Sequence, residues 1–158
     1  MNKNIKIIIS ATLVVIWMAV IFVFSATPAD ESDKQSKGVI YIITEKIEGK
    51  SAEQIENIDS LNHLIRKFAH GSVYFVLCML IMNLILQIKD KNYKFTYALV
   101  AILISFLYAC TDEFHQIFVD GRAGRFTDIL IDTLGATLGV TLYVLIFKIR
   151  KNMLINKK

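Results

Sequence analysis

The stretch TDEFHQIFVDGRAGRFTD, residues 111–128, concentrates side chains that can do chemistry. Carboxylates and imidazoles exchange protons, and arginine side chains bind phosphate or carboxylate through paired hydrogen bonds. Strongly apolar sequence lies on both sides, with ALVAILISFLYAC before the stretch and LGVTLYVLIF after it. Ionisable groups are unusual next to such apolar sequence, so their presence needs a physical explanation. The groups are Asp112, Glu113, His115, Asp120, Arg122, Arg125 and Asp128.

Helical spacing arranges the polar residues of three segments in stripes. Residues three, four or seven positions apart lie on one face of an α-helix. If the three segments are neighbouring helices with their polar ends on the same side, the stripes meet at one mouth of a bundle. The stripes are Lys67, His70 and Tyr74; Asp112, His115 and Gln116; and Asp128, Asp132, Gly135 and Gly139.

Four long apolar runs are the elements that position these stripes. Residues 7–29, 71–88 and 95–111 contain no Asp, Glu, Lys or Arg, and residues 129–147 contain only Asp132. A helix crosses the hydrocarbon core of a bilayer, about 30 Å, with ~17–25 residues. The mean hydropathy of +0.50 is also well above that of ordinary soluble proteins. The first run is longer than the ~7–15 apolar residues of a signal peptide, so we expect a retained helix.

We therefore expect an all-α membrane protein with four transmembrane helices in an antiparallel bundle. Residues 1–158 form a single transmembrane domain, with helices at about 5–25, 62–88, 95–114 and 127–149 and an outer segment at 26–61. Apolar residues at helical spacing begin at Val39 and again at Ile55 in that outer segment. We expect amphipathic helices on the outer membrane interface there, the second capped by Asp59 or Ser60. The alternative is that these helices form a lid or a docking surface over the polar site formed by the stripes.

The distribution of positive charge predicts cytoplasmic N and C termini. With that orientation, the inner segments carry 10 of the 18 basic residues and one acid, Asp90, whereas 12 of the 13 other acids lie outside. Short cytoplasmic loops of membrane proteins are enriched in Lys and Arg. The pI of about 9.0 then reflects topology and attraction to anionic lipid. We expect the lipid bilayer as a partner and no nucleic acid.

The polar stripes meet at the outer mouth of the expected bundle. A charge at the centre of a lone transmembrane helix costs at least ~2.5–3.5 kcal/mol, so it normally faces protein or water. His70 and Asp132, each about one turn below the surface, most need a partner, which arginine can supply. The candidate ligand-binding residues are Arg66, Lys67, His70, Tyr74, Asp112, Glu113, His115, Gln116, Arg122, Arg125, Asp128 and Asp132.

Each of these features also has a simpler interpretation. His70 alone is more often a buried neutral imidazole bonded to a carboxylate, and GRAGR is as readily a turn with two solvated arginines as an anion-binding loop. Gly135 and Gly139 form a GxxxG pattern that indicates close helix packing, although it can also serve dimerisation, so the oligomeric state stays open. Cys78 and Cys110 lack metal-type spacing and are expected to be packing residues.

The spacing of potential ligands predicts no metal site and no cofactor. His70, His115 and Glu113 offer a less favoured alternative, a zinc or other divalent site. Nothing in the sequence presents itself as a nucleophile, so the catalytic residues are unassigned. The candidates for proton transfer are Glu113, His70, Asp112 and His115.

The chain resembles the VanZ-like family of small bacterial polytopic membrane proteins through three motifs. FSATP at 24–28 is similar to the family's F-S-x-x-P, and RKFAHGSVY at 66–74 to its R-K-x-x-H-x-x-x-Y. TDEFHQIFVDGRAGRFTD resembles D-E-x-H-Q-x-F-x-x-G-R-x-x-x-x-x-D, and the continuation through Asp132 and Gly135 also fits. The resemblance covers nearly the whole chain except residues 30–59. Asp132 departs from it, since Asn is expected there in many members.

The resemblance implies a multi-pass protein of the bacterial plasma membrane, in a family whose best-known member lowers susceptibility to the lipid-tailed glycopeptide teicoplanin. It assigns no catalytic roles. The favoured hypothesis is that the outer mouth binds a lipid-linked cell-wall precursor, another anionic envelope ligand or a lipoglycopeptide. The first alternative is an enzyme acting on a lipid-linked substrate, with Glu113 and His70 as the acid–base pair. The second is a structural or accessory protein whose polar cluster only holds the helices together.

Overall fold

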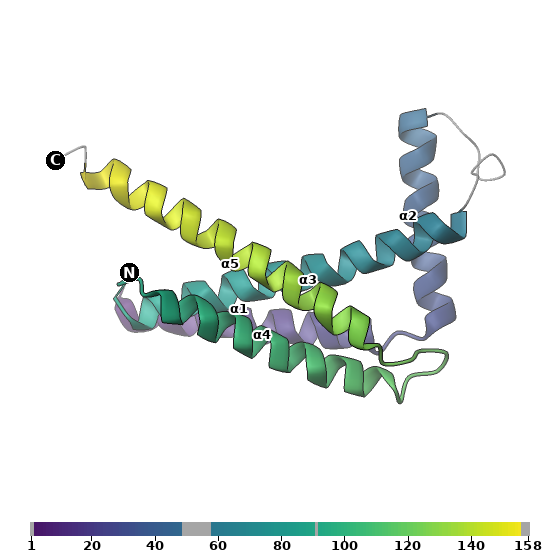
Figure 1. Ribbon diagram of the computed structural model, residues 1–158, viewed down its shortest axis with the longest axis horizontal. Coiled ribbons are helices and arrows are strands. Elements are labelled where there is room, and N and C mark those ends of the chain that lie inside the picture. The colour runs from purple at the N-terminus through teal and green to yellow at the C-terminus, as the bar shows by residue number, and fades with distance from the viewer. Residues whose placement is uncertain (1, 49–57, 91, 156–158) are drawn as a thin grey trace.

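The computed structural model describes residues 2–48, 58–90 and 92–155, and all the regular elements in these ranges are helices. Four long helices lie along one another, and a fifth stands across one end of them (Figure 1). An all-α fold was predicted and is confirmed. The elements are α1 (Lys3–Ser25), α2 (Ala29–Glu48), α3 (Ile58–Ile88), α4 (Phe95–Gln116) and α5 (Phe126–Ile155).

Four of the helices, α1, α3, α4 and α5, are long and apolar enough to cross a membrane. They correspond to the four expected spans, although α3 begins earlier and α5 ends later than the apolar runs. Large hydrophobic side chains such as Val15, Leu103 and Leu134 stay exposed on their outer surfaces. Since lipid is the solvent that accepts such surfaces, the chain is a multi-pass membrane protein.

The outer segment differs from the expected pair of interfacial helices. Its first apolar pattern forms α2, but the second pattern belongs to the first turns of α3, which already begins at Ile58. Ile55 lies outside the described residues. The prediction that Asp59 or Ser60 caps a helix is wrong, because Asp59 lies in the first turn of α3 and Ser60 follows it. A carboxylate in a first turn still interacts favourably with the helix dipole.

Helix α3 is the centre of the bundle, since it contacts each of the other four helices. Its closest partner is α5, through Gly135 and Gly139. A Cβ atom at Gly135 would lie 2.0 Å from the carbonyl oxygen of Gly71, and one at Gly139 would lie 2.2 Å from that of Phe75. The backbones therefore touch, which only glycine permits. The predicted GxxxG packing is thus used within the chain.

Small residues and hydrogen bonds between side chains complete the packing inside the bundle. Helix α4 turns Ala101, Ser105 and Ala109 towards the core, each with 0% exposure. Trp17 of α1 donates from Nε1 to the carbonyl of Val73, at 2.8 Å. Similar bonds join Tyr108 to the Met18 carbonyl, Asn83 to Ser10, and Tyr143 to Asn83. Several polar side chains in the middle of the bundle are therefore paired across helices.

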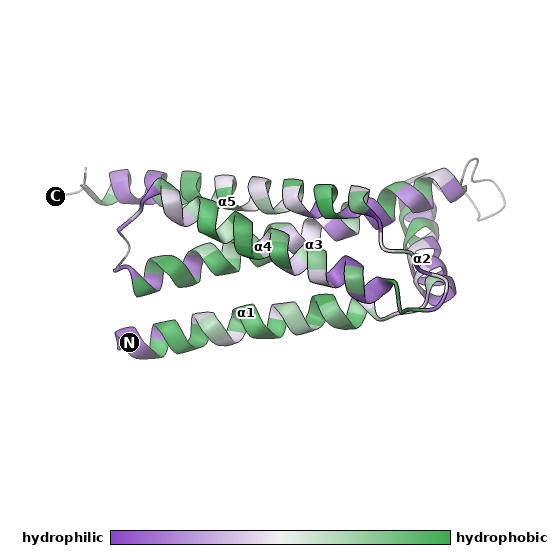
Figure 2. Ribbon diagram, turned by 60° about the horizontal axis from the view of Figure 1, so that its bottom comes forward, coloured by the Kyte–Doolittle hydropathy of each residue, from purple (hydrophilic) through white to green (hydrophobic). Residues whose placement is uncertain are grey.

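The two ends of the bundle differ in composition. The N and C termini lie at one end and α2 lies at the other (Figure 1). At the terminal end, Lys3 pairs with Asp90 in the α3–α4 turn. At the other end, hydrophilic residues lie along α2, which contacts α3, and at the neighbouring end of α4 (Figure 2). We call this end, with α2 and the α4–α5 loop at 117–125, the α2 end. The polar stripes meet there, as the antiparallel arrangement predicted.

Candidate functional site

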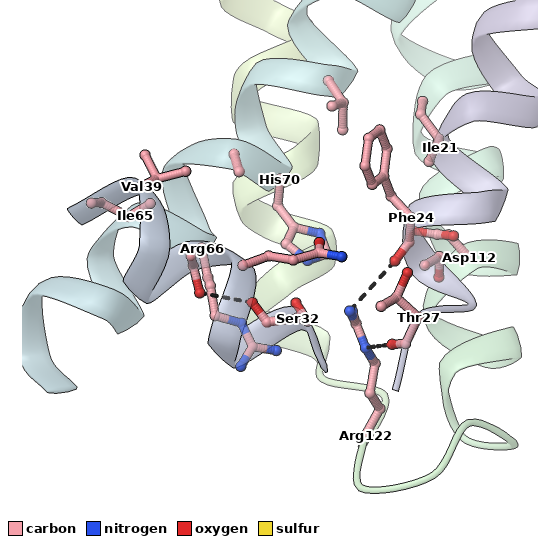
Figure 3. A pocket seen from close by; sticks show the side chains of 15 residues that line it. Ile21, Phe24, Thr27, Ser32, Val39, Ile65, Arg66, His70, Asp112 and Arg122 are labelled. Carbon is pink, nitrogen blue, oxygen red and sulfur yellow. Dashed lines mark hydrogen bonds between the residues drawn. The ribbon is translucent and has the colours of Figure 1, made fainter. Parts of the chain in front are cut away.

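A cavity of about 420 Å³ lies at the α2 end, between α1, α2, α3 and the α4–α5 loop. Arg66 and His70 reach it from α3, and Arg122 from the loop (Figure 3). Asp112 reaches it from α4. The rest of its wall is apolar or carries hydroxyl and amide groups, and is made by Ile21, Phe24, Ser25, Thr27, Ser32, Gln35, Ser36, Val39, Ile65, Ala69 and Val73.

Helix α2 supplies one wall of this cavity. Its attachment to α3 is polar. The Asn62 side chain donates to Asp33 Oδ1, and Lys37 pairs with Asp33 at 3.1 Å and with Asp59 at 3.0 Å. Ile40 adds an apolar contact, since it is only 1% exposed. Whether α2 also rests on the membrane interface stays a prediction.

The α4–α5 loop is fastened to the junction between α1 and α2. Arg122 donates from Nε to the carbonyl of Thr27 at 2.7 Å, and Nη2 lies 3.4 Å from the carbonyl of Phe24. The N–H of Ala29 donates to the Asp120 carbonyl at 3.1 Å. Gly121 has a φ of 70°, a conformation that favours glycine. Arg122 therefore both positions the loop and lines the cavity.

The second glycine of GRAGR, Gly124, allows the loop to lie against α4. A Cβ atom there would lie 2.5 Å from the Glu113 carbonyl oxygen. This close approach lets the backbone N–H of Arg125 donate to Glu113 Oε2 at 2.8 Å. The Arg125 side chain itself is exposed and does not line the cavity. Of the two arginines of the motif, Arg122 thus lines the cavity and Arg125 does not.

Four potential metal ligands converge beside the cavity, which we call the carboxylate cluster: His70, Asp112, Glu113 and Asp132. One ligand atom from each lies within 4.8 Å of those from the other three. Asp132 is 0% exposed, and its Oδ1 is 3.9 Å from His70 Nδ1. Within the described ranges, four carboxylate oxygens of the cluster are buried without a hydrogen-bond partner. They are Asp112 Oδ1, Glu113 Oε1 and both oxygens of Asp132.

This cluster differs from the metal ligand set considered from the sequence. His115 is not part of it, because its ring packs on Phe22 of α1, with centroids 4.4 Å apart. Asp112 and Asp132 join His70 and Glu113 instead. The sequence predicted no metal site, whereas the structure brings together four residues that could hold a divalent ion.

The remaining sequence candidates occupy the surroundings of the cavity. Tyr74 is fully buried in the core below His70, and its hydroxyl has no hydrogen-bond partner among the described residues. Gln116 is buried at the end of α4, and Asp128 is half-buried in the first turn of α5. Lys67 is half-buried beside Arg66 but does not line the cavity.

The sequence did not identify which residues of α1 and α2 line the cavity. Ser32, Gln35, Ser36 and Val39 lie at helical spacing on α2, so a face was recognisable. Nothing in the sequence fixed the direction in which that face points. Phe24 belongs to the FSATP motif, and the position of this motif at the end of the first apolar run was the one feature of the sequence that indicated a contribution of α1 to the site.

The surroundings of Arg122 disfavour its positive charge. Burial lowers the pKa of Arg122, and the nearby positive charge of Arg66 lowers it further, against the opposing effect of Asp112 and Glu113. A lowered pKa means that the cation is less well stabilised than in water. An anion in the cavity would offset part of this cost through charge-assisted hydrogen bonds.

Residues 10–148 match the family model described as VanZ/LLP1. The match includes α1 from Ser10, the cavity, the carboxylate cluster and most of α5. Neither the curated proteins nor the solved structures gave a match to the chain. The family assignment therefore rests on the family model and agrees with the motif resemblance.

Proposed function

The chain belongs to the VanZ/LLP1 family, and we propose that it binds the anionic headgroup of a lipid-linked envelope molecule at the outer face of the bacterial plasma membrane. One observation carries the proposal: the cavity at the α2 end joins an apolar wall to two arginines. In this assignment, the α2 end faces outwards, in agreement with the predicted cytoplasmic termini.

The two parts of the cavity suit the two parts of an amphiphile. Arg66 and Arg122 present guanidinium groups, which bind phosphate or carboxylate through paired hydrogen bonds. Phe24, Val39 and Val73 offer apolar surface for the adjoining hydrocarbon. Small-molecule sites measure roughly 300–1,000 Å³, so a cavity of about 420 Å³ accepts a headgroup and the start of a chain. The rest of a long lipid would remain in the bilayer.

The direct test is binding of a polyprenyl phosphate to the purified chain in detergent, measured by native mass spectrometry. Arg66→Gln is the best variant, because Arg122 also fastens the loop. The variant loses a charge-assisted hydrogen bond to the phosphate, which contributes about 1.5–3 kcal/mol. We therefore expect its affinity for the polyprenyl phosphate to be roughly ten- to a hundredfold lower. Arg150→Gln makes the same charge change at the terminal end and should bind normally. Equal binding by the two variants would reject the cavity as the site.

Arg125→Gln separates the cavity from the alternative anion-binding loop. Its side chain is exposed and outside the cavity, so phosphate binding should persist. Loss of binding in this variant alone would transfer the site to the GRAGR loop. The two variants therefore decide between a pocket and a surface turn.

The cellular consequence proposed from family membership is lower susceptibility to lipid-tailed glycopeptides. The test compares teicoplanin and vancomycin dose–response in a susceptible Gram-positive host carrying the vector, the wild type or Arg66→Gln at matched membrane levels. We expect a shift for teicoplanin and not for vancomycin, lost in the variant. An unchanged teicoplanin response with well-expressed protein would remove resistance from the function.

A second candidate function is an enzyme acting on a lipid-linked substrate. The observation in its favour is that Glu113 and His70 lie in the same cluster, with potential proton-transfer atoms within 4.8 Å. It predicts that Glu113→Gln abolishes turnover of a polyprenyl phosphate or diphosphate while the folded protein still binds it. Unchanged turnover in this variant would reject acid–base catalysis by Glu113.

The purely structural alternative receives less support. Polar residues that join the helices in the middle of the bundle find partners, as Trp17 and Tyr108 do. Within the described ranges, the oxygens of Asp132 have no hydrogen-bond partner, and the nearest charged group, His70 Nδ1, lies 3.9 Å from Oδ1. Buried polar groups without partners are costly, so they are retained where a ligand, an ion or a proton completes them.

A further inference from the structure

The carboxylate cluster brings three buried acids next to one another. Asp112, Glu113 and Asp132 are 4%, 3% and 0% exposed. The charged partner of Asp132 within 4 Å, among the described residues, is His70. Three neighbouring carboxylates in a low-dielectric interior repel one another unless protons or a cation compensate them. The cluster therefore requires a positively charged occupant or protonation.

The fold holds these groups together by contacts that tolerate little change. Gly71 follows His70 directly, and Gly135 lies one turn below Asp132, so the backbone contact between these glycines fixes the two ligands side by side. Glu113 is oriented separately, because the Arg125 N–H holds its Oε2 and leaves Oε1 without a partner in the described ranges. A hydrogen bond that orients a ligand in this way is typical of metal sites.

We propose that His70, Asp112, Glu113 and Asp132 bind a divalent transition-metal cation. Three helices, α3, α4 and α5, contribute these ligands. Four ligands about 2.0–2.2 Å from one ion lie roughly 3.3–3.6 Å from each other in a tetrahedron. The ligand atoms lie up to 4.8 Å apart, so the most distant pair must approach by about 1.2–1.5 Å, which small torsional changes in both side chains achieve.

The donor set indicates the class of ion. Imidazole nitrogen suits Zn²⁺, Fe²⁺ and related metals, and carboxylates suit Mn²⁺ and Mg²⁺, so one histidine with three carboxylates favours Zn²⁺ or Mn²⁺. Ca²⁺ prefers oxygen ligands alone and a larger coordination number. The cation would reduce the charge of three ionised carboxylates from −3 to −1, which lowers the cost of burying them.

The position of the cluster also matters for the cavity. His70 and Asp112 belong to both, so the ion would stand in the cavity wall near Arg66 and Arg122. It would add positive charge where an anionic headgroup enters. This last consequence rests on the proposed function, whereas cation binding does not.

The test measures metal binding by the full chain in detergent, stripped with EDTA and dialysed against Zn²⁺ or Mn²⁺. Elemental analysis should find about one ion per wild-type chain, and Mn²⁺ binding can be followed by electron paramagnetic resonance. Asp132→Asn should weaken binding by at least about tenfold. Asp120→Asn changes the same charge on an exposed loop residue and should bind normally. His115→Gln should also bind normally.

All chains in this assay carry Cys110→Ser, which removes the partly exposed cysteine, so reaction of the buried Cys78 with a thiol dye reports unfolding. The ion should raise the melting temperature of the wild type and of Asp120→Asn but not of Asp132→Asn. Glu113→Gln is the second ligand variant, for use if Asp132→Asn does not fold. Binding of neither ion by the wild type, or equal binding by wild type and ligand variants, overturns the proposal.

The same preparations keep this proposal separate from the proposed function. Metal uptake without any binding of polyprenyl phosphate would support the cation site and reject the cavity ligand. Binding of polyprenyl phosphate by the EDTA-stripped chain, with no metal uptake, would support the cavity ligand and reject the cation site. Phosphate binding that strengthens on adding Zn²⁺ in the wild type, and not in Asp132→Asn, would support both.

Discussion

At the scale of single residues, Arg122 and Arg125 have different roles although three positions separate them in one motif. Arg122 joins the α4–α5 loop to two carbonyls at the end of α1. Arg125 contributes only its backbone N–H, and its side chain is exposed. A substitution of the side chain should therefore affect the two positions very differently.

We expect Arg122→Gln to destabilise the fold by about 1.5–3 kcal/mol, because hydrogen bonds from a charged donor are lost. Arg125→Gln should change stability by no more than about 0.5 kcal/mol, as exposed substitutions usually do. Thermal unfolding in detergent, followed by thiol-dye reaction at Cys78 in a Cys110→Ser background, measures both. Equal destabilisation of the two variants would contradict the loop attachment described here.

The same scale shows why the sequence predicted some members of the site and not others. Asp112 and Glu113 were expected near His70 and Asp132, and the structure brings all four together. His115 was placed on the stripe of Asp112, yet it packs against Phe22. On a helix, Glu113 and His115 lie on opposite sides of Asp112, at about 100° and 60°. Only the packing of neighbouring helices decides which side faces the cluster.

At the scale of elements, the contact between α3 and α5 depends on glycine. Substitution by alanine normally favours a helix by about 1 kcal/mol. At Gly139 the added methyl group would meet the backbone of Phe75 at 2.2 Å, so the helices must separate. At Gly38 of α2 nothing lies within 4 Å of the added atom.

Gly139→Ala should therefore destabilise the bundle by at least about 1–3 kcal/mol, the cost of overpacking. Gly38→Ala is the matched control and should be neutral or stabilising by up to about 1 kcal/mol. Melting temperatures from the Cys78 assay compare them. A stable Gly139→Ala variant would show that α3 and α5 do not touch as described.

The attachment of α2 should depend on pH through Asp33. The Lys37 side chain holds the pKa of Asp33 below its usual range, and the Asn62 side chain contributes. A carboxylate with a lowered folded pKa stabilises the attached state above its ordinary pKa of about 3.9 and loses that effect as pH falls. Attachment should thus be constant from pH 8 to 5 and weaken below about pH 4.

Spin labels at Glu45→Cys on α2 and Leu64→Cys on α3, in a Cys110→Ser background, measure this attachment. The distance distribution should broaden at low pH in the wild type. Asp33→Asn should show a broader distribution already at neutral pH and a smaller further change on acidification. A distribution that ignores both pH and the substitution would mean that apolar contacts such as Ile40 alone hold α2.

Elements of the membrane region were the most predictable part of the fold. Bilayer thickness sets both the length and the apolar character of a span, so α1, α3, α4 and α5 could be located from sequence alone. Bilayer thickness does not constrain the length or composition of α2 in this way. Its polar and apolar faces fit a membrane surface as well as a cavity wall, and side-chain contacts with α3 decide between them.

At the scale of the whole molecule, the two ends of the bundle should face different compartments. The termini and the α3–α4 turn share one end, and α2 lies at the other (Figures 1 and 2). The cavity and the carboxylate cluster lie at the α2 end. The sequence assigns the first end to the cytoplasm from its excess of Lys and Arg. Orientation then decides which molecules can enter the cavity.

Single cysteines at exposed positions test this orientation, in a chain with Cys110→Ser and with Cys78 buried in the core. A membrane-impermeant maleimide should label Lys34→Cys of α2 in intact cells, because the α2 end faces outwards. Lys151→Cys at the end of α5 should react only after the membrane is permeabilised. The reversed pattern would place the cavity in the cytoplasm, where no externally added glycopeptide reaches it. The cation site would survive that result, since its ligands depend on helix packing and not on orientation.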